Sequence, residues 1–296
     1  GALSGLLIWA ADRLYYPGYS KSQTAAPRPL GKGIFSGRGL QRWVVGPRTA
    51  VALKEVRGFL RDQAQWTQLF LICALVVIYL FNFKALPLEK APIKTIYLQN
   101  LLSFLNVGLA GFVLTAIAAR FAFPAVSNER EAIWIIHAAP LSLRAFLWIK
   151  YAAYLVPLLL LTEILVVVTN FLLNVTPFMM GLSTATVALL VPGVVSLAVG
   201  LGAAYPNFKA ETPAQAATGF GGLLFMMLAA IYIGTVLVLE AGPVYAIMRA
   251  GFEGRRLAGR EQIWILLNFG LSLIIHLAIL LYPMRWGEKR LTRFLE

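Results

Sequence analysis

Long apolar runs separated by short charged segments dominate the pattern of this chain. Four stretches contain no Asp, Glu, Lys or Arg, namely 63–83, 95–119, 212–239 and 262–284, and a fifth, 151–208, contains only Glu163. A helix of about 20 apolar residues crosses the roughly 30 Å hydrocarbon layer of a bilayer. The runs do not alternate between apolar and polar residues, as strands of a membrane barrel would. The pattern therefore predicts membrane-spanning helices.

The stretch 151–208 is too long for one span, and a turn inside it is expected at Asn174, Thr176 and Pro177 because proline disfavours continuation of a helix. The chain is thus predicted to be all-α, a polytopic transmembrane helical bundle of about six spans. The expected spans are about 67–83, 98–119, 151–173, 178–203, 217–239 and 262–283.

Charge sets the class and the orientation. Only 13% of the residues are charged, against about a quarter in a soluble domain. With the segment 12–66 in the cytoplasm, 19 Lys and Arg residues fall inside and 7 outside, so we expect this orientation, with a cytoplasmic C-terminus. The net charge of +13 then suits an anionic lipid leaflet. Nucleic acid is not expected as a partner, because the basic residues flank spans and form no aromatic-interleaved patch.

The part before the first span divides into two regions. Residues 1–16 are interpreted as the end of a preceding transmembrane span, which implies a longer protein. Residues 17–48 are rich in Pro, Gly and Ser and basic, which predicts a flexible linker. The six-span domain is expected over 49–296.

The residues 49–66 predict an amphipathic helix at the start of this domain. Leu53 and Val56 fall on one stripe, whereas Lys54 and Arg57 fall on another. Such a helix next to a span is expected to lie in the membrane interface, the alternative being an extension of the first span.

The segment 120–150 between the second and third spans is too apolar for an ordinary loop. Asn128 and Glu131 have the spacing of a capping box, which predicts a short apolar helix over 132–139. Pro140 then ends that helix, and Ser142 caps the next one. A short apolar helix on the cytoplasmic side needs a cover, which is either another subunit or the protein's own helices and the lipid surface.

Few residues within the spans carry chemistry. Glu163 lies about halfway along the third span, where an ionisable side chain is costly. Glu163 and Asn106 are candidates for a translocation path. The alternatives are a protonated or hydrogen-bonded packing contact for Glu163 and, favoured for Asn106, a hydrogen bond between helices. The two histidines, His137 and His276, are far apart in the expected topology, so no metal site is predicted. No catalytic residue is expected either, because the acids do not cluster.

Three stretches resemble a known family: KEVRGFLRDQAQWTQLF (54–70), FAFPAVSNEREAIWIIHAAPLS (121–142) and YPNFKAETPAQAATGFGG (205–222). They are similar to the membrane subunits of bacterial ATP-binding-cassette (ABC) exporters of the type-2 permease group, in which two membrane halves are joined by a linker. The chain resembles the C-terminal half. The resemblance covers most of 49–296.

This resemblance implies a place for each unusual segment. The interfacial helix 49–66 would be a connecting helix, and 128–139 would be a cytoplasmic coupling helix. Residues 241–261 would form short helices on the outer side. A cytoplasmic ABC ATPase would contact the coupling helix, through Glu129, Arg130, Glu131 and Trp134. A second permease half or protomer would be a further partner. The protein would lie in the bacterial cytoplasmic membrane.

The chemistry of ATP is expected in that partner. The sequence contains no G-x-x-x-x-G-K-[ST] phosphate loop, so ATP and Mg²⁺ are assigned to the ATPase subunit, and this chain is expected to bind no cofactor and to be no enzyme. Two alternatives stay open: an ion-coupled secondary transporter, which would use charged groups at the midplane, and an integral membrane enzyme that modifies lipids.

Overall fold

A computed structural model describes residues 46–61, 63–84, 95–210 and 212–296. These residues belong to one compact unit, Val45–Glu296. The expected preceding span (1–16) and almost all of the expected linker (17–48) lie outside the described residues. The described part of the chain is helical and contains no strand.

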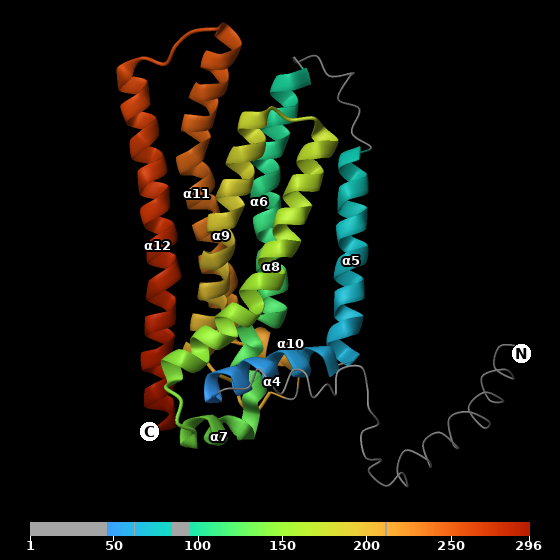
Figure 1. The fold of residues 1–296 in the computed structure, drawn as a ribbon, viewed down its shortest axis with the longest axis vertical. Helices are drawn as coiled ribbons and strands as arrows, with labels where there is room; N and C mark the ends of the chain where they lie inside the picture. The colour runs from blue at the N-terminus through green and yellow to red at the C-terminus, as the bar shows by residue number, and fades with distance from the viewer. Residues whose placement is uncertain (1–45, 62, 85–94, 211) are drawn as a thin grey trace, which may run out of the picture. The chain divides into compact units, whose positions relative to one another are not determined.

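Among the residues that the structure describes, six helices are long and apolar enough to cross a membrane, so the chain is a multi-pass membrane protein of all-α class, as predicted. They run side by side in Figure 1. These helices are α5 (Gln63–Lys84), α6 (Thr95–Phe121), α8 (Leu143–Leu173), α9 (Pro177–Ala204), α11 (Phe220–Glu253) and α12 (Gly259–Leu295).

The turn that separates α8 from α9 forms where the sequence predicts it. Asn174 adopts the left-handed conformation that ends α8, with φ of 50°. The side chain of Thr176 then accepts a hydrogen bond from the N–H of Met179, and Pro177 is the first residue of α9. Each residue type suits its position, since Asn tolerates positive φ, Thr caps helix starts and Pro lacks the N–H that a first turn leaves unpaired.

The prediction of short outer helices over 241–261 is wrong. Helix α11 continues without a break to Glu253, Gly254 ends it with φ of 65°, and α12 begins at Gly259. Glu240 does not end the helix, and its carboxyl group is buried and hydrogen-bonded inside the bundle.

Arginine and glutamate side chains hold the turn between α11 and α12. The guanidinium of Arg255 pairs with Glu253 at 3.0 Å and with both carboxylate oxygens of Glu261 at 2.8 and 3.0 Å. Glu261 also accepts the N–H of Ala258 at the start of α12. Arg249 also pairs with Glu253, at 2.7 Å, so two of the basic residues of this region are paired with carboxylates at the turn.

Helix α9 forms the centre of the bundle, and its cytoplasm-proximal half in the predicted topology is buried on all sides. Small residues allow neighbouring backbones to approach it closely. A Cβ added to Gly287 of α12 would lie 2.3 Å from the carbonyl oxygen of Gly200, and a Cβ added to Gly202 would lie 2.1 Å from that of Phe123. Larger side chains cannot occupy these positions without moving a helix.

The short elements gather at one end of the bundle, the end that also carries the C-terminus (Figure 1). Helix α4 runs crosswise to the long helices there. The turns between α8 and α9 and between α11 and α12 lie at the opposite end. The short elements are α4 (Pro47–Arg61), the 3-10 helices η3 (Phe123–Ala125) and η4 (Ser127–Ala132), α7 (Ile133–Ala138) and α10 (Pro213–Ala217).

The segment between α6 and α8 differs from its prediction at one helix start. Ser142 caps α8 as expected, accepting the N–H of Ala145 at 3.2 Å. The predicted capping box of Asn128 and Glu131 is wrong, because α7 begins only at Ile133, after Ala132, with no side-chain cap. The preceding residues form a 3-10 helix instead, whose side chains bond to other parts of the chain.

Candidate functional site

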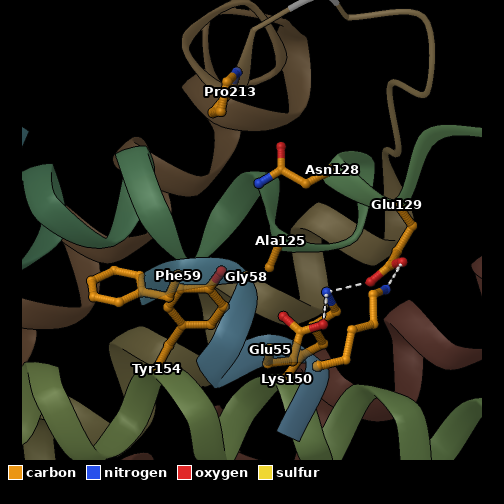
Figure 2. A pocket seen from close by; sticks show the side chains of 10 residues that line it. Glu55, Gly58, Phe59, Ala125, Asn128, Glu129, Lys150, Tyr154 and Pro213 are labelled. Atoms are coloured by element: carbon orange, nitrogen blue, oxygen red, sulfur yellow. Dashed lines mark hydrogen bonds and ion pairs between the residues drawn. The ribbon is translucent and has the colours of Figure 1, made fainter. Parts of the chain in front are cut away.

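Glu129 of η4 lies at the centre of a charge network that joins three elements. Its carboxylate accepts a hydrogen bond from Lys150 Nζ of α8 at 2.6 Å, and its other oxygen pairs with Lys54 of α4. Lys150 also reaches Glu55 of α4, with 2.8 Å between Nζ and Oε1. Figure 2 shows Glu55, Glu129 and Lys150 pointing toward one another.

The central pair of this network is buried. The side chains of Glu129 and Lys150 are 4% and 3% exposed, whereas Lys54 is half exposed. A charge removed from water is costly unless it is paired and hydrogen-bonded. The network meets that requirement because two lysines face two glutamates. Lys150 also lies 5.4 Å from the ring centroid of Phe146, which adds a cation–π contact.

Local structure explains why these residues meet. Lys54 and Glu55 are neighbours in α4, and Lys150 stands two turns into α8. The tight 3-10 turn at Phe123–Ala125, buried against α9, turns the chain after α6 and places η4 between those two helices. Ser127 fixes the same segment from its other side, by accepting the N–H of Asn207 at 3.0 Å.

A cavity of about 350 Å³ lies against the network. Beyond the four charged side chains, its walls come from α4, η3, η4, α8 and α10 (Figure 2): Gly58, Phe59, Ala125, Asn128, Tyr154 and Pro213.

The network changes the acidity of Glu129. Burial alone would raise the pKa of this carboxyl group, but the charges and hydrogen bonds of Lys150 and Lys54 outweigh it and hold the pKa below its ordinary value of 4.5. Glu129 is therefore ionised at neutral pH, and the ion pairs persist there.

The structure describes the side chains of two of the four residues predicted to contact a partner. Glu129 points into the protein, as described above. Trp134 lies on α7 and is 67% exposed, which leaves its indole ring free of the protein's own core. The side chains of Arg130 and Glu131 lie outside the described part of the structure. The position of these residues does not show whether they contact a partner, so that contact stays a prediction.

The two residues predicted for a translocation path do not form one site. Asn106 of α6 is buried and accepts a hydrogen bond from the hydroxyl of Tyr79 in α5, while its Nδ2 has no partner among the described residues. Glu163 is half-buried in α8, and no hydrogen bond among the described residues joins it to Asn106. Their role in transport stays a prediction.

Sequence reasoning missed a buried acid inside the bundle. Glu240 of α11 is 4% exposed. It accepts hydrogen bonds from Thr186 of α9 at 2.7 Å and from Ser272 of α12 at 3.2 Å. Two turns away, Tyr232 bonds to His276 of α12. The apolar pattern resumes directly after Glu240, with Val244 and Ile247, and this continuation was the signal available in the sequence.

One comparison with known proteins identifies a relationship. A family model described as "Putative ATP-binding cassette" matches residues 2–295. No curated protein and no solved structure matches the chain.

Proposed function

Because the chain belongs to this ATP-binding-cassette family, we propose that it is a transmembrane permease subunit of an ABC exporter, of the type-2 kind. It moves its substrate across the membrane by alternating access, and a separate ATPase subunit supplies the energy. ATP and Mg²⁺ are bound in that subunit, where ATP is hydrolysed to ADP and phosphate, so this chain itself is no enzyme.

The observation that carries the proposal is the position of η4 and α7. They link two spans, they expose Trp134, and the buried carboxylate of Glu129 connects them to α4 and α8 through ion pairs with Lys54 and Lys150. A partner that moves α7 therefore also moves the crosswise helix and the first turns of α8. An exposed tryptophan beside charged residues is typical of an interface anchor.

Alternating access follows from this connection. The ATPase pushes or pulls α7 during its cycle, and the paired charges keep η4, α4 and the end of α8 moving together. The spans then change between an inward-open and an outward-open arrangement, which is a shift between two packed states. A second permease half or a second protomer supplies the other wall of the path.

The proposed setting is the bacterial cytoplasmic membrane. The end of the bundle with α4, α7 and the C-terminus faces the cytoplasm, because the excess of Lys and Arg lies on that side. This orientation brings α7 within reach of a cytoplasmic ATPase. It also places the α8–α9 and α11–α12 turns on the outer side.

Replacement of Trp134 tests the proposal. The chain is purified in mild detergent together with an ABC ATPase co-expressed from the same genomic neighbourhood, and the ATPase recovered per permease is measured. We expect Trp134→Ala to lower this recovery at least about tenfold, as removal of a central aromatic anchor does, while insertion and yield stay normal.

Phe171→Ala is the matched control. Phe171 is 69% exposed at the opposite end of α8, so its loss removes similar apolar surface without touching α7. Equal recovery of the ATPase with Trp134→Ala and with the unchanged chain would refute the assigned contact. A chain that transports its substrate in vesicles with no ATPase at all would refute the exporter itself.

A second candidate function is ion-coupled transport. The observation that favours it is the buried Glu240, which with Glu163 gives two acids inside the spans, and ionisable groups at such depth often belong to ion paths. Glu240→Gln distinguishes the two: it would abolish uptake driven by an ion gradient, and it would leave ATP-dependent export by a coupled ATPase in place.

A further inference from the structure

A second cavity at the same end of the bundle has a different composition. It lies between the first turn of α8 and the last turns of α12, with a volume of about 400 Å³, within the size range of ligand sites. Its lining residues are Arg144, Arg285, Glu288, Lys289, Thr292 and Arg293. Four cations thus face a single carboxylate.

Most of this positive charge is not neutralised by the protein. Glu288 pairs with Arg144, with 3.0 Å between Oε2 and Nε. Arg285, Lys289 and Arg293 have no ion-pair partner among the described residues, and all three are exposed. Their spacing of four residues places them on one stripe of α12. Three adjacent like charges repel one another, and an anion bound between them removes that repulsion.

An apolar crevice continues from the basic cavity toward the interior of the bundle. It has a volume of about 130 Å³ and shares Arg144, Arg285 and Glu288 with the larger cavity. Its remaining walls come from apolar side chains of α8 and α12, namely Leu147, Trp148, Leu281 and Met284. A charged mouth therefore opens into an apolar slot that runs between two spans.

We propose that these two cavities form a binding site for one anionic phospholipid. The phosphate group lies among Arg285, Lys289 and Arg293, and one acyl chain enters the crevice beside Trp148 and Leu281. Basic pockets between spans at the cytoplasmic surface are suited to anionic headgroups. A free phosphate ion would fill only the charged part, and a zwitterionic lipid would bring its own cation into it.

The site follows from the membrane setting and does not depend on the ATPase partner. A lipid held there bridges α8 and α12 close to the point where α8 leaves α7. The leaflet's content of anionic lipid would thereby influence how firmly these two spans are held together.

Binding of phosphatidylglycerol to the delipidated, detergent-purified chain tests the proposal, with phosphatidylcholine as the reference lipid. We expect a clear preference for phosphatidylglycerol. The triple variant R285Q/K289Q/R293Q should bind it about 100-fold more weakly, because each basic residue near an anionic lipid surface contributes about a fivefold factor.

A triple variant of equal charge provides the control. R256Q/R260Q/R290Q also removes three positive charges, but from exposed positions that do not line the cavity. It should change the affinity by less than about threefold. An equal loss in both triple variants would mean that net charge alone attracts the lipid, and the proposal would be wrong. Size-exclusion profiles verify that both variants fold.

A second arm distinguishes the lipid from free phosphate. Leu281→Trp fills the crevice and leaves the charges intact, so it should weaken phosphatidylglycerol about tenfold without changing the binding of inorganic phosphate. If Leu281→Trp has no effect on the lipid, and phosphate displaces the lipid at equal concentration, the cavity is a phosphate site and the proposed lipid site is refuted.

Discussion

Two cavities at one end of this bundle contain similar side chains and use them in opposite ways. In the first, Lys54 and Lys150 face Glu55 and Glu129, and each charge finds its counter-ion within the chain. In the second, three cations on α12 face only Glu288, which Arg144 already engages. The charges of the first cavity are neutralised within the chain, whereas the cations of the second are available to bind an external anion.

Burial explains the difference. Lys150 is 3% exposed, and a lysine at that depth is stable only with carboxylates in direct contact. The basic residues of α12 are exposed, so they keep their hydration and need no counter-ion within the chain. The first cavity therefore serves as a joint between elements, whereas the second serves as a surface for binding. Both are positioned by α8, which contributes Lys150 to one and Arg144 to the other.

The largest expected effect comes from breaking the ion pairs of the first cavity. Lys150→Met removes the cation that two buried carboxylates share, and we expect a loss of about 3–5 kcal/mol in the free energy of unfolding, as for other broken buried pairs. The measurement is denaturant unfolding in detergent. Arg293→Met is the matched control from the second cavity, expected to change stability by no more than about 0.5 kcal/mol.

Equal losses in these two variants would contradict the contrast between the cavities. The double variant Glu129→Gln with Lys150→Met sharpens the comparison further. It leaves no charge of the central pair unpaired, so it should be less destabilised than the sum of its single changes.

The next largest effect is expected from neutralising positive charge in the second cavity. Thr292→Glu places a carboxylate among Arg285, Lys289 and Arg293 and makes the second cavity resemble the first. Affinity for phosphatidylglycerol should fall about tenfold, since the new charge neutralises one cation and repels the phosphate. Thr292→Gln, of similar size but uncharged, should retain most of the affinity. If both variants weakened lipid binding equally, the shape of the cavity and not its charge would determine the affinity.

A smaller effect is expected from pH. The pKa of Glu129 is lowered below its ordinary value of 4.5 by Lys150 and Lys54 acting against burial, so its contribution to stability is present above that value and is lost as the pH falls through the lower, folded-state value. Unfolding curves should show no change from this group between about pH 6 and 8. They should show a decline below 4.5 that Glu129→Gln reduces. An identical decline in that variant would mean that other groups are responsible.

The sequence predicted the parts of this structure that depend on neighbouring residues. Apolar runs located all six spans, and the Asn174–Pro177 turn follows from residue types that suit their positions. The pairing of Glu129 was not predictable in this way, because Lys54 and Lys150 lie 75 and 21 positions away along the chain. Which of several charges meet is decided by how α4, η4 and α8 pack.

The same limit explains the error at α11. A charge ends an apolar run when residues are counted along the chain, so the fifth span was predicted to end at 239. In the bundle, Thr186 and Ser272 donate hydrogen bonds to Glu240, and these bonds make the carboxyl group compatible with the interior. Such compensation comes from other helices, and the local pattern gave only one sign of it, the apolar residues that follow Glu240.

Labelling of a single cysteine at position 135, next to Trp134 on α7, tests the central claim most directly. Ile135, which is exposed, is replaced by cysteine together with Cys73→Ser, which removes the chain's one cysteine, and a membrane-impermeant maleimide is applied to intact cells and to inverted membrane vesicles. We predict labelling only in inverted vesicles, with protection when the ABC ATPase is bound. Labelling from the outside of intact cells, or equal labelling with and without the ATPase, would contradict the account.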